Sequence, residues 1–79
     1  MDKNKEIFLQ NLGKHIIFLR EKQGLSQTQL ALKCDKDRQS IHRLEKGEVN
    51  PSAYYLIQIA EALEVHPKKL LDFEIELTR

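Results

Sequence analysis

Residues 26–47, SQTQLALKCDKDRQSIHRLEKG, carry the signals for two short helices joined by a tight turn. Ser26 followed three residues later by Gln29 forms a capping box, in which each side chain satisfies the other's free backbone N–H. We therefore expect a helix to begin at Gln27. Asp37 offers its carboxylate as the N-cap of the next helix. A turn of about three residues makes two helices cross steeply and closely, so the segment predicts a tightly packed helix pair.

The apolar residues of this helix pair lie at helical spacing and face inward. Leu30, Ile41 and Leu44 point into a shared core, and the small side chain of Ala31 allows the two helices to touch. A second helix held in this way has its N-terminal half lifted clear of the body. A helix is about 10–12 Å across, which fits the major groove of B-DNA.

A first helix is predicted ahead of the pair, over residues 5–22. Gly24 ends this helix as a left-handed C-cap. Its buried stripe consists of Leu9, Leu12, Ile16 and Leu19.

Two further helices are predicted after the pair. Beyond the break at Asn50-Pro51, Ser52 caps a fourth helix. His66-Pro67 opens a fifth, because proline suits the first helical turn. The residues expected to anchor these two helices are Leu56, Ile59, Ala60, Leu63, Leu70 and Leu71. We therefore predict an all-α, compact five-helix domain with a short C-terminal tail.

Length and composition limit the class of protein. A chain of 79 residues forms a single domain, 1–79, which excludes a multi-domain enzyme. Its 41% hydrophobic and 32% charged residues are typical of a soluble globular protein. No run approaches the ~18 apolar residues that span a bilayer, and the N-terminal MDKNKEIF lacks the apolar stretch of a signal peptide. We expect a cytoplasmic protein without a membrane partner.

Charge is unevenly distributed along the chain, although the formal net charge is only +1. Residues 14–46 hold eight Lys and Arg against four acids, an excess of four positive charges. Residues 51–79 hold three Lys and Arg against five acids, an excess of two negative charges. This asymmetry is expected when one side of a protein meets phosphate, and it is also compatible with ordinary solvated charge.

The stretch from residue 12 to residue 73 resembles the Cro/repressor-type helix-turn-helix family of phage and bacterial transcriptional regulators. The resemblance rests on Leu25-Ser26-Gln27, Leu30-Ala31, Ile41, Leu44-Glu45, Gly47, Asn50-Pro51, Ala60 and Leu63. It implies a lambda-repressor-like domain whose helix-turn-helix motif, residues 27–46, binds double-stranded operator DNA, commonly as a homodimer. Asp37-Arg38 is also similar to restriction–modification controller proteins, an alternative within the family.

Four polar side chains share the outward face of the helix that begins after Asp37: Arg38, Gln39, His42 and Arg43. Arginine pairs with guanine O6/N7 and glutamine with adenine N6/N7, so this face is suited to reading base edges. The family resemblance implies base reading at the same helix positions. We therefore predict a sequence-specific, DNA-binding transcriptional regulator.

A second set of polar residues is suited to the DNA backbone, whose contacts fix the register without reading sequence. Ser26 and Gln27 lie at a helix N-terminus, where free N–H groups and the helix dipole favour a phosphate. The resemblance implies a backbone contact for Gln27 and a phosphate clamp after the recognition helix. The set comprises Ser26, Gln27, Lys36, Lys46, Asn50, Ser52 and Tyr54.

The resemblance also implies a partly buried ion pair between Arg20 and Glu45, which holds the first helix against the recognition helix. The turn departs from the family pattern at three places. Asp35 stands where the family has a glycine with positive φ, Lys36 replaces an apolar residue, and Asp37 places negative charge near phosphate.

Other kinds of site have little support in the sequence. The three histidines are far apart and Cys34 is alone, so no metal site is expected, and Cys34 is typical of a small core residue. We also expect no cofactor, no small-molecule substrate and no enzymatic activity, because nucleophile and phosphate-loop motifs are missing. The alternative from another class is a protein–protein module, such as an antitoxin or scaffold.

Apolar residues outside the predicted core raise the question of a dimer. Ile7 and Phe18 fall nearly opposite the buried stripe of the first helix, so another segment should cover them. The tail 73–79 alternates like a strand through Phe73, Ile75 and Leu77, and it also fits a helical extension. We expect this tail to cover the second face, within one chain or across a homodimer. A dimer would read a pseudo-palindromic site with half-sites about 34 Å apart.

Overall fold

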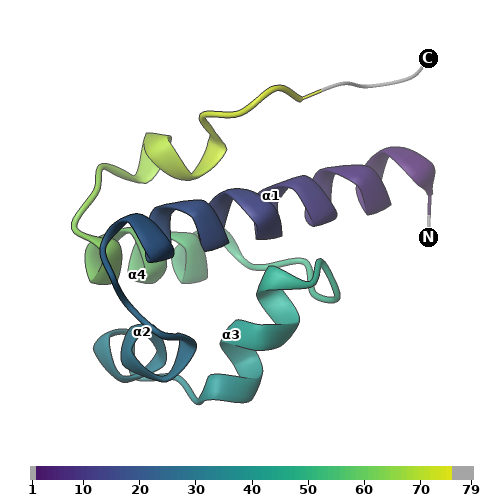
Figure 1. The fold of residues 1–79 in the computed structure, drawn as a ribbon. Helices are drawn as coiled ribbons and strands as arrows, with labels where there is room; N and C mark the ends of the chain where they lie inside the picture. The colour runs from purple at the N-terminus through teal and green to yellow at the C-terminus, as the bar shows by residue number, and fades with distance from the viewer. Residues whose placement is uncertain (1, 76–79) are drawn as a thin grey trace.

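The computed structural model describes residues 2–75, which form four α-helices and one 3-10 helix (Figure 1). The elements are α1 (Lys3–Lys22), α2 (Gln27–Lys33), α3 (Arg38–Glu45), α4 (Ala53–Leu63) and the 3-10 helix η1 (Pro67–Leu71). No strand occurs among the described residues, which confirms the all-helical prediction. No helix of this part of the chain is long and apolar enough to cross a membrane.

The fifth element differs from the prediction, because it is a 3-10 helix and not an α-helix. The segment has only five residues, and its turns close through i to i+3 bonds such as Lys69 N to His66 O at 2.9 Å. With three residues per turn, consecutive leucines point in different directions. Leu70 is therefore fully buried, whereas Leu71 is 44% exposed and does not anchor the helix as expected.

The helix starts depend on local side-chain caps, and those predicted after residue 25 are confirmed. Ser26 and Gln29 form the reciprocal capping box, with distances of 3.1 and 2.8 Å. Asp37 caps α3 and Ser52 caps α4. The first helix begins two residues earlier than predicted, because Asp2 accepts a bond from Lys5 N at 3.0 Å.

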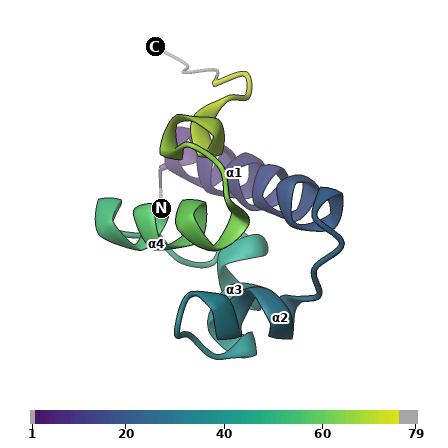
Figure 2. The ribbon, with the colours of Figure 1, turned by 90° about the vertical axis from the view of Figure 1, so that its left-hand side faces the viewer.

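A single hydrophobic core joins all five elements. α1 runs through the middle of the molecule, with α2 and α3 on one side and η1 on the other (Figures 1 and 2). The largest fully buried side chains come from every element: Leu12, Ile16, Leu30, Ile41, Leu44, Ile59, Leu63 and Leu70. This packing holds α3 against α1 and α2 by its apolar inner face.

Gly13 allows α1 to cross the C-terminal end of α3 at very close range. A Cβ atom at this position would collide with Glu45 O, and it would lie only 2.7 Å from Glu45 C and 2.9 Å from Leu44 O. Those neighbours are backbone atoms of a helix end, which cannot turn aside as a side chain can. The end of α3 is therefore pressed against α1 where α1 has no side chain.

The described part of the tail, residues 73–75, packs against α1 through Phe73. Phe73 stacks on Phe8 with ring centroids 5.9 Å apart and tilts against His15 at 5.3 Å. Ile7 and Phe18 stay 37% and 57% exposed. Residues 72–75 form neither strand nor helix, and the predicted Leu77 lies outside the described residues.

Replacing Gly13 by alanine tests the helix crossing. We expect Gly13→Ala to lower the free energy of unfolding by about 1–3 kcal/mol, because the added methyl group forces the two helices apart. Urea denaturation measures the change. Lys14→Ala, at an exposed position on the same helix, should change stability by less than about 0.5 kcal/mol. Equal stabilities for the two variants would contradict the close crossing.

The contact made by Phe73 is tested in the same way. We expect Phe73→Ala to cost roughly 1–2 kcal/mol of stability, because the half-buried ring loses its contacts with Phe8 and His15. Deleting residues 73–79 should lower the melting temperature at least as much. Glu74→Ala is the control, since Glu74 is exposed beside it. A Phe73→Ala variant with the same melting temperature as the wild type would show that the contact does not stabilise the protein.

Candidate nucleic-acid interface

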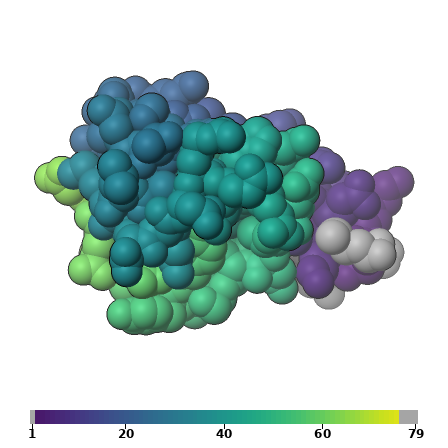
Figure 3. Space-filling view, turned by 90° about the horizontal axis from the view of Figure 1, so that it is seen from below, coloured from purple at the N-terminus to yellow at the C-terminus, as the bar shows by residue number. Residues whose placement is uncertain are grey.

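The outward face of α3 carries the four polar side chains that the sequence singled out. Arg38, Gln39 and Arg43 are exposed, and His42 is half-buried. On the opposite side of the same helix, Ile41 and Leu44 are 0% and 1% exposed. Figure 3 looks at this side of the molecule and shows α2 and α3 next to each other at its surface. The four side chains are therefore carried on a helix that is fixed from behind.

The turn between α2 and α3 is built around two aspartates. Asp35 has φ +57°, the left-handed conformation expected at this position, which aspartate tolerates better than most residues. Asp37 caps α3 by accepting a bond from Ser40 N at 2.7 Å. That bond, together with one from the Ser40 hydroxyl, lowers the pKa of the Asp37 carboxyl. Asp37 therefore stays ionised at the start of α3, where its charge suits the helix dipole.

Arg20 and Glu45 form a bidentate ion pair between α1 and α3. Arg20 Nε and Glu45 Oε2 are 2.7 Å apart, and the second guanidinium nitrogen is 3.1 Å from Oε1. The two side chains are only 11% and 2% exposed. Arg20 also donates to Leu25 O at 2.8 Å, so its guanidinium ties the α1–α2 turn to the same carboxylate.

Gln27 extends this ion pair across α2 to the polar face of α3. Its amide nitrogen donates to Glu45 Oε1 at 2.9 Å and lies 3.3 Å from His42 Nδ1. Its amide oxygen accepts from Arg38 at 3.4 Å. Gln27 was predicted only as a contact to the DNA backbone. Its link to α3 spans 15 and 18 residues of sequence, and no local pattern signals such a link.

The other predicted backbone contacts lie on exposed surface around the motif. The hydroxyls of Ser26 and Ser52 are engaged as helix caps. Lys46 follows α3 directly and makes a loose ion pair of 3.6 Å with Glu48, in which both side chains are about half exposed. Asn50 is exposed as well, and Tyr54 is exposed on the first turn of α4.

Lys36 lies over an aromatic ring at the edge of the motif. Its ammonium is 4.9 Å from the centre of the Tyr55 ring, a cation–π distance. Burial is the main cause that raises the pKa of the Tyr55 hydroxyl, which has no hydrogen-bond partner among the described residues. Lys36 stays exposed in this position, so its charge is still presented to solvent beside the turn.

Cys34 is a buried core residue at the end of α2, as the sequence predicts. It is 6% exposed, and its thiol lies 3.2 Å from Leu30 O. Burial raises the pKa of this thiol, which keeps it neutral and unreactive. Within residues 2–75, no group of three or more His, Cys, Asp or Glu side chains is arranged to hold a metal ion.

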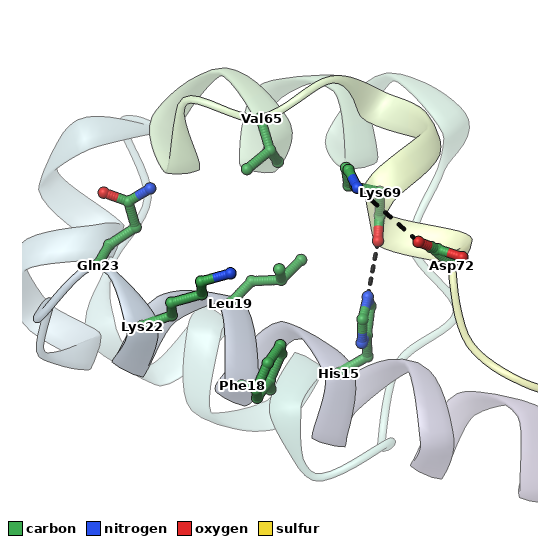
Figure 4. A pocket seen from close by; sticks show the side chains of 8 residues that line it. All are labelled: His15, Phe18, Leu19, Lys22, Gln23, Val65, Lys69 and Asp72. Atoms are coloured by element: carbon green, nitrogen blue, oxygen red, sulfur yellow. Dashed lines mark hydrogen bonds and ion pairs between the residues drawn. The ribbon is translucent and has the colours of Figure 1, made fainter.

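A cleft of about 290 Å³ lies apart from α3, between α1 and the segment that carries η1 (Figure 4). His15 Nε2 crosses it to Lys69 O at 2.7 Å, and Lys69 pairs with Asp72 at 4.0 Å. Its lining residues are His15, Phe18, Leu19, Lys22, Gln23, Val65, Lys69 and Asp72. They come from α1, the turn after it and residues 65–72, so the cleft is separate from the candidate interface.

Comparison with known proteins identifies the class. A helix-turn-helix family model matches residues 16–70, which contain the motif, the ion pair and most of the core. The chain therefore belongs to the helix-turn-helix family, of the Cro/repressor type that its sequence resembles.

Particular relatives narrow the comparison. Control protein C.BamHI of Bacillus amyloliquefaciens is 44% identical over 52 residues, a match that covers 66% of this chain and 64% of that protein. The restriction–modification controller protein C.AhdI of Aeromonas hydrophila has a similar structure, with a TM-score of 0.80, 32% identity and coverage of 82% of this chain and 94% of that one. The hypothetical transcription factor NHTF from Neisseria gives a TM-score of 0.78 at 27% identity, with 85% of this chain and 77% of that chain covered.

The buried ion pair generates a stability prediction. We expect Arg20→Met to lower the free energy of unfolding by about 3 kcal/mol, because it leaves the buried Glu45 carboxylate without its counter-charge. Chemical denaturation measures the loss. Lys46→Met is the matched control, since it breaks an exposed pair and should cost less than about 1 kcal/mol. Similar losses in both variants would mean that the Arg20 pair is no more important than a surface pair.

Proposed function

We propose that this protein is a transcriptional regulator that binds double-stranded DNA sequence-specifically through the major groove. The observation that carries the proposal is the polar face of α3, which stands outward on a helix whose apolar side packs into the core. As a regulator it performs no catalysis, needs no cofactor and acts in the cytoplasm.

Base reading is assigned to Arg38, Gln39, His42 and Arg43. All four side chains carry hydrogen-bond donors, and glutamine and histidine also carry acceptors. Arginine suits guanine and glutamine suits adenine, so the face has enough donors and acceptors to distinguish base pairs in the major groove. The half-buried position of His42 places its ring deeper in the face than the arginines.

Backbone anchoring is assigned to the exposed polar groups at the two ends of the motif. Lys46 and Lys36 supply charge, and Asn50 and Tyr54 supply neutral donors. Ser26, Gln27 and Ser52 mark the helix starts of α2 and α4, which present backbone N–H groups. These contacts set how α3 lies in the groove.

Two copies of the chain are proposed to act together. One short recognition helix reads few base pairs, and each good bidentate contact adds only about 1–3 kcal/mol of discrimination. A homodimer doubles the number of contacts and reads a pseudo-palindromic site with half-sites about 34 Å apart. Exposed apolar side chains available for association include Phe18, Leu71 and Ile75 of the tail.

Within the family, a restriction–modification controller is the preferred subclass. The support is the likeness to the two controller proteins named above, at 44% and 32% identity. The rival from another class, an antitoxin or scaffold, would use the same fold to hold a protein partner. It predicts an apolar surface where α3 carries arginine, glutamine and histidine, so the polar face favours DNA.

The decisive experiment is a selection from random double-stranded oligonucleotides at one stated salt concentration. We expect an enriched sequence with two-fold symmetry, whose half-site spacing reports the dimer. A selection that enriches no sequence would favour the protein-binding rival.

Substitutions separate base reading from backbone binding. We expect Arg43→Ala and Gln39→Ala each to cost about 1–3 kcal/mol of specific binding and to relax the preference at one base position. Lys46→Ala should weaken all sequences alike and reduce the slope of log K against log salt by about 1. Binding titrations at several salt concentrations measure both effects. Lys68→Ala, on η1 across α1 from the motif, is the control, and an Arg43→Ala variant with intact specificity would contradict the assignment.

A further inference from the structure

The amide of Gln27 has only one orientation that satisfies its neighbours. The Glu45 carboxylate can only accept hydrogen bonds, so it requires the amide nitrogen, which lies 2.9 Å from Oε1. The Arg38 guanidinium can only donate, so it requires the amide oxygen, at 3.4 Å. With the amide turned over, its oxygen would face the Glu45 carboxylate and its nitrogen would face the Arg38 guanidinium. Neither hydrogen bond could then form. Arg20 holds Glu45 in place, so the orientation is anchored in the buried part of the protein.

This orientation determines which nitrogen of His42 carries the proton. The amide nitrogen of Gln27 lies 3.3 Å from Nδ1 of His42. Because that nitrogen is a donor, Nδ1 must accept, and a neutral ring then carries its proton on Nε2. No group among residues 2–75 bonds Nε2, so this N–H is free for a ligand.

We propose that Gln27 is a specificity-determining residue that acts through His42, by holding the ring in the tautomer that presents an Nε2–H donor to the major groove. An Nε2–H donor matches the acceptors there, which are guanine N7 and O6, adenine N7 and thymine O4. It mismatches the amino group of cytosine. The opposite tautomer would present an acceptor and reverse this preference. The inference rests on the proposed function, because it concerns how the same face reads bases.

The role differs from the backbone contact already assigned to Gln27, and the two can be separated. Loss of a phosphate contact weakens binding to all sequences alike. Loss of control over His42 changes the preference at one base pair and leaves the other positions unchanged. That base pair is identified as the position whose preference disappears in His42→Ala.

The first arm of the test uses the protein without DNA. Nitrogen-15 NMR of the histidine rings at about pH 8, where an ordinary imidazole is neutral, shows which ring nitrogen is protonated. We expect His42 to carry its proton on Nε2 in the wild type. In Gln27→Met, which keeps the side-chain length without the amide, the two nitrogen shifts should move toward each other. Gln27→Lys restores a donor and should restore the wild-type spectrum. A proton on Nδ1 in the wild type, or a spectrum unchanged in Gln27→Met, overturns the proposal.

The second arm measures binding to the selected site and to variants of its His42 base pair. We expect Gln27→Met to lose discrimination at that base pair by about 3- to 10-fold. The same substitution should change nothing further there in a His42→Ala background. Gln10→Met, an exposed glutamine on α1, is the matched control. Uniform weakening alone would overturn the role through His42. If the wild type binds no DNA, the proposed function fails, and so does the part of this proposal that concerns base preference. The NMR measurement still tests the part that concerns the tautomer of His42.

Discussion

The buried carboxylate of Glu45 is the group on which the arrangement of the motif depends. It lies at the last residue of α3 and is reached from α1 by Arg20 and from α2 by Gln27. A carboxylate with 2% exposure is tolerated in a protein interior only when its lone pairs are matched by donors. Because these donors come from α1 and α2, satisfying the carboxylate fixes how the three helices lie relative to one another. Apolar packing alone is less directional and would define this arrangement less precisely.

The close approach at Gly13 acts at the same end of α3. The backbone of α1 rests on the carbonyl groups of Leu44 and Glu45, so the C-terminal end of α3 is the end that is held. Gly47 repeats this arrangement just beyond, where an added Cβ would lie 3.0 Å from the Cα atom of Gln10. The N-terminal end of α3 lies farther from α1, next to α2 at the edge of the molecule (Figure 1). A helix that is held closely at one end and reaches the surface at the other is suited to entering a groove.

Local signals in the sequence predicted most of the fold, and long-range contacts explain what was missed. The helix starts at Ser26, Asp37 and Ser52 could be predicted because a cap involves residues three apart. The inward and outward faces of α3 follow from helical periodicity in the same way. The 3-10 form of η1 depends on a segment too short for stable α-helical turns, and periodicity does not report it. The bridge from Gln27 to α3 and the contact of Gly13 with α3 join residues distant in sequence, so only the folded chain shows them.

In the proposed complex with DNA, the low net charge leaves most of the attraction to individual contacts. A net charge of +1 produces little long-range attraction to DNA, compared with the strongly basic domains that bind through their field. Asp37 adds a persistent negative charge at the start of α3, because its capping bond lowers the pKa of the carboxyl. In the proposed complex with DNA, that charge would repel phosphate. Arg38 stands beside it on the outward face, and in the proposed complex its guanidinium would offset this charge where a base or phosphate accepts a hydrogen bond from it. In the proposed complex, the cap that begins α3 would therefore lower the affinity for DNA, a cost that is partly offset because the same carboxylate stabilises the start of the helix.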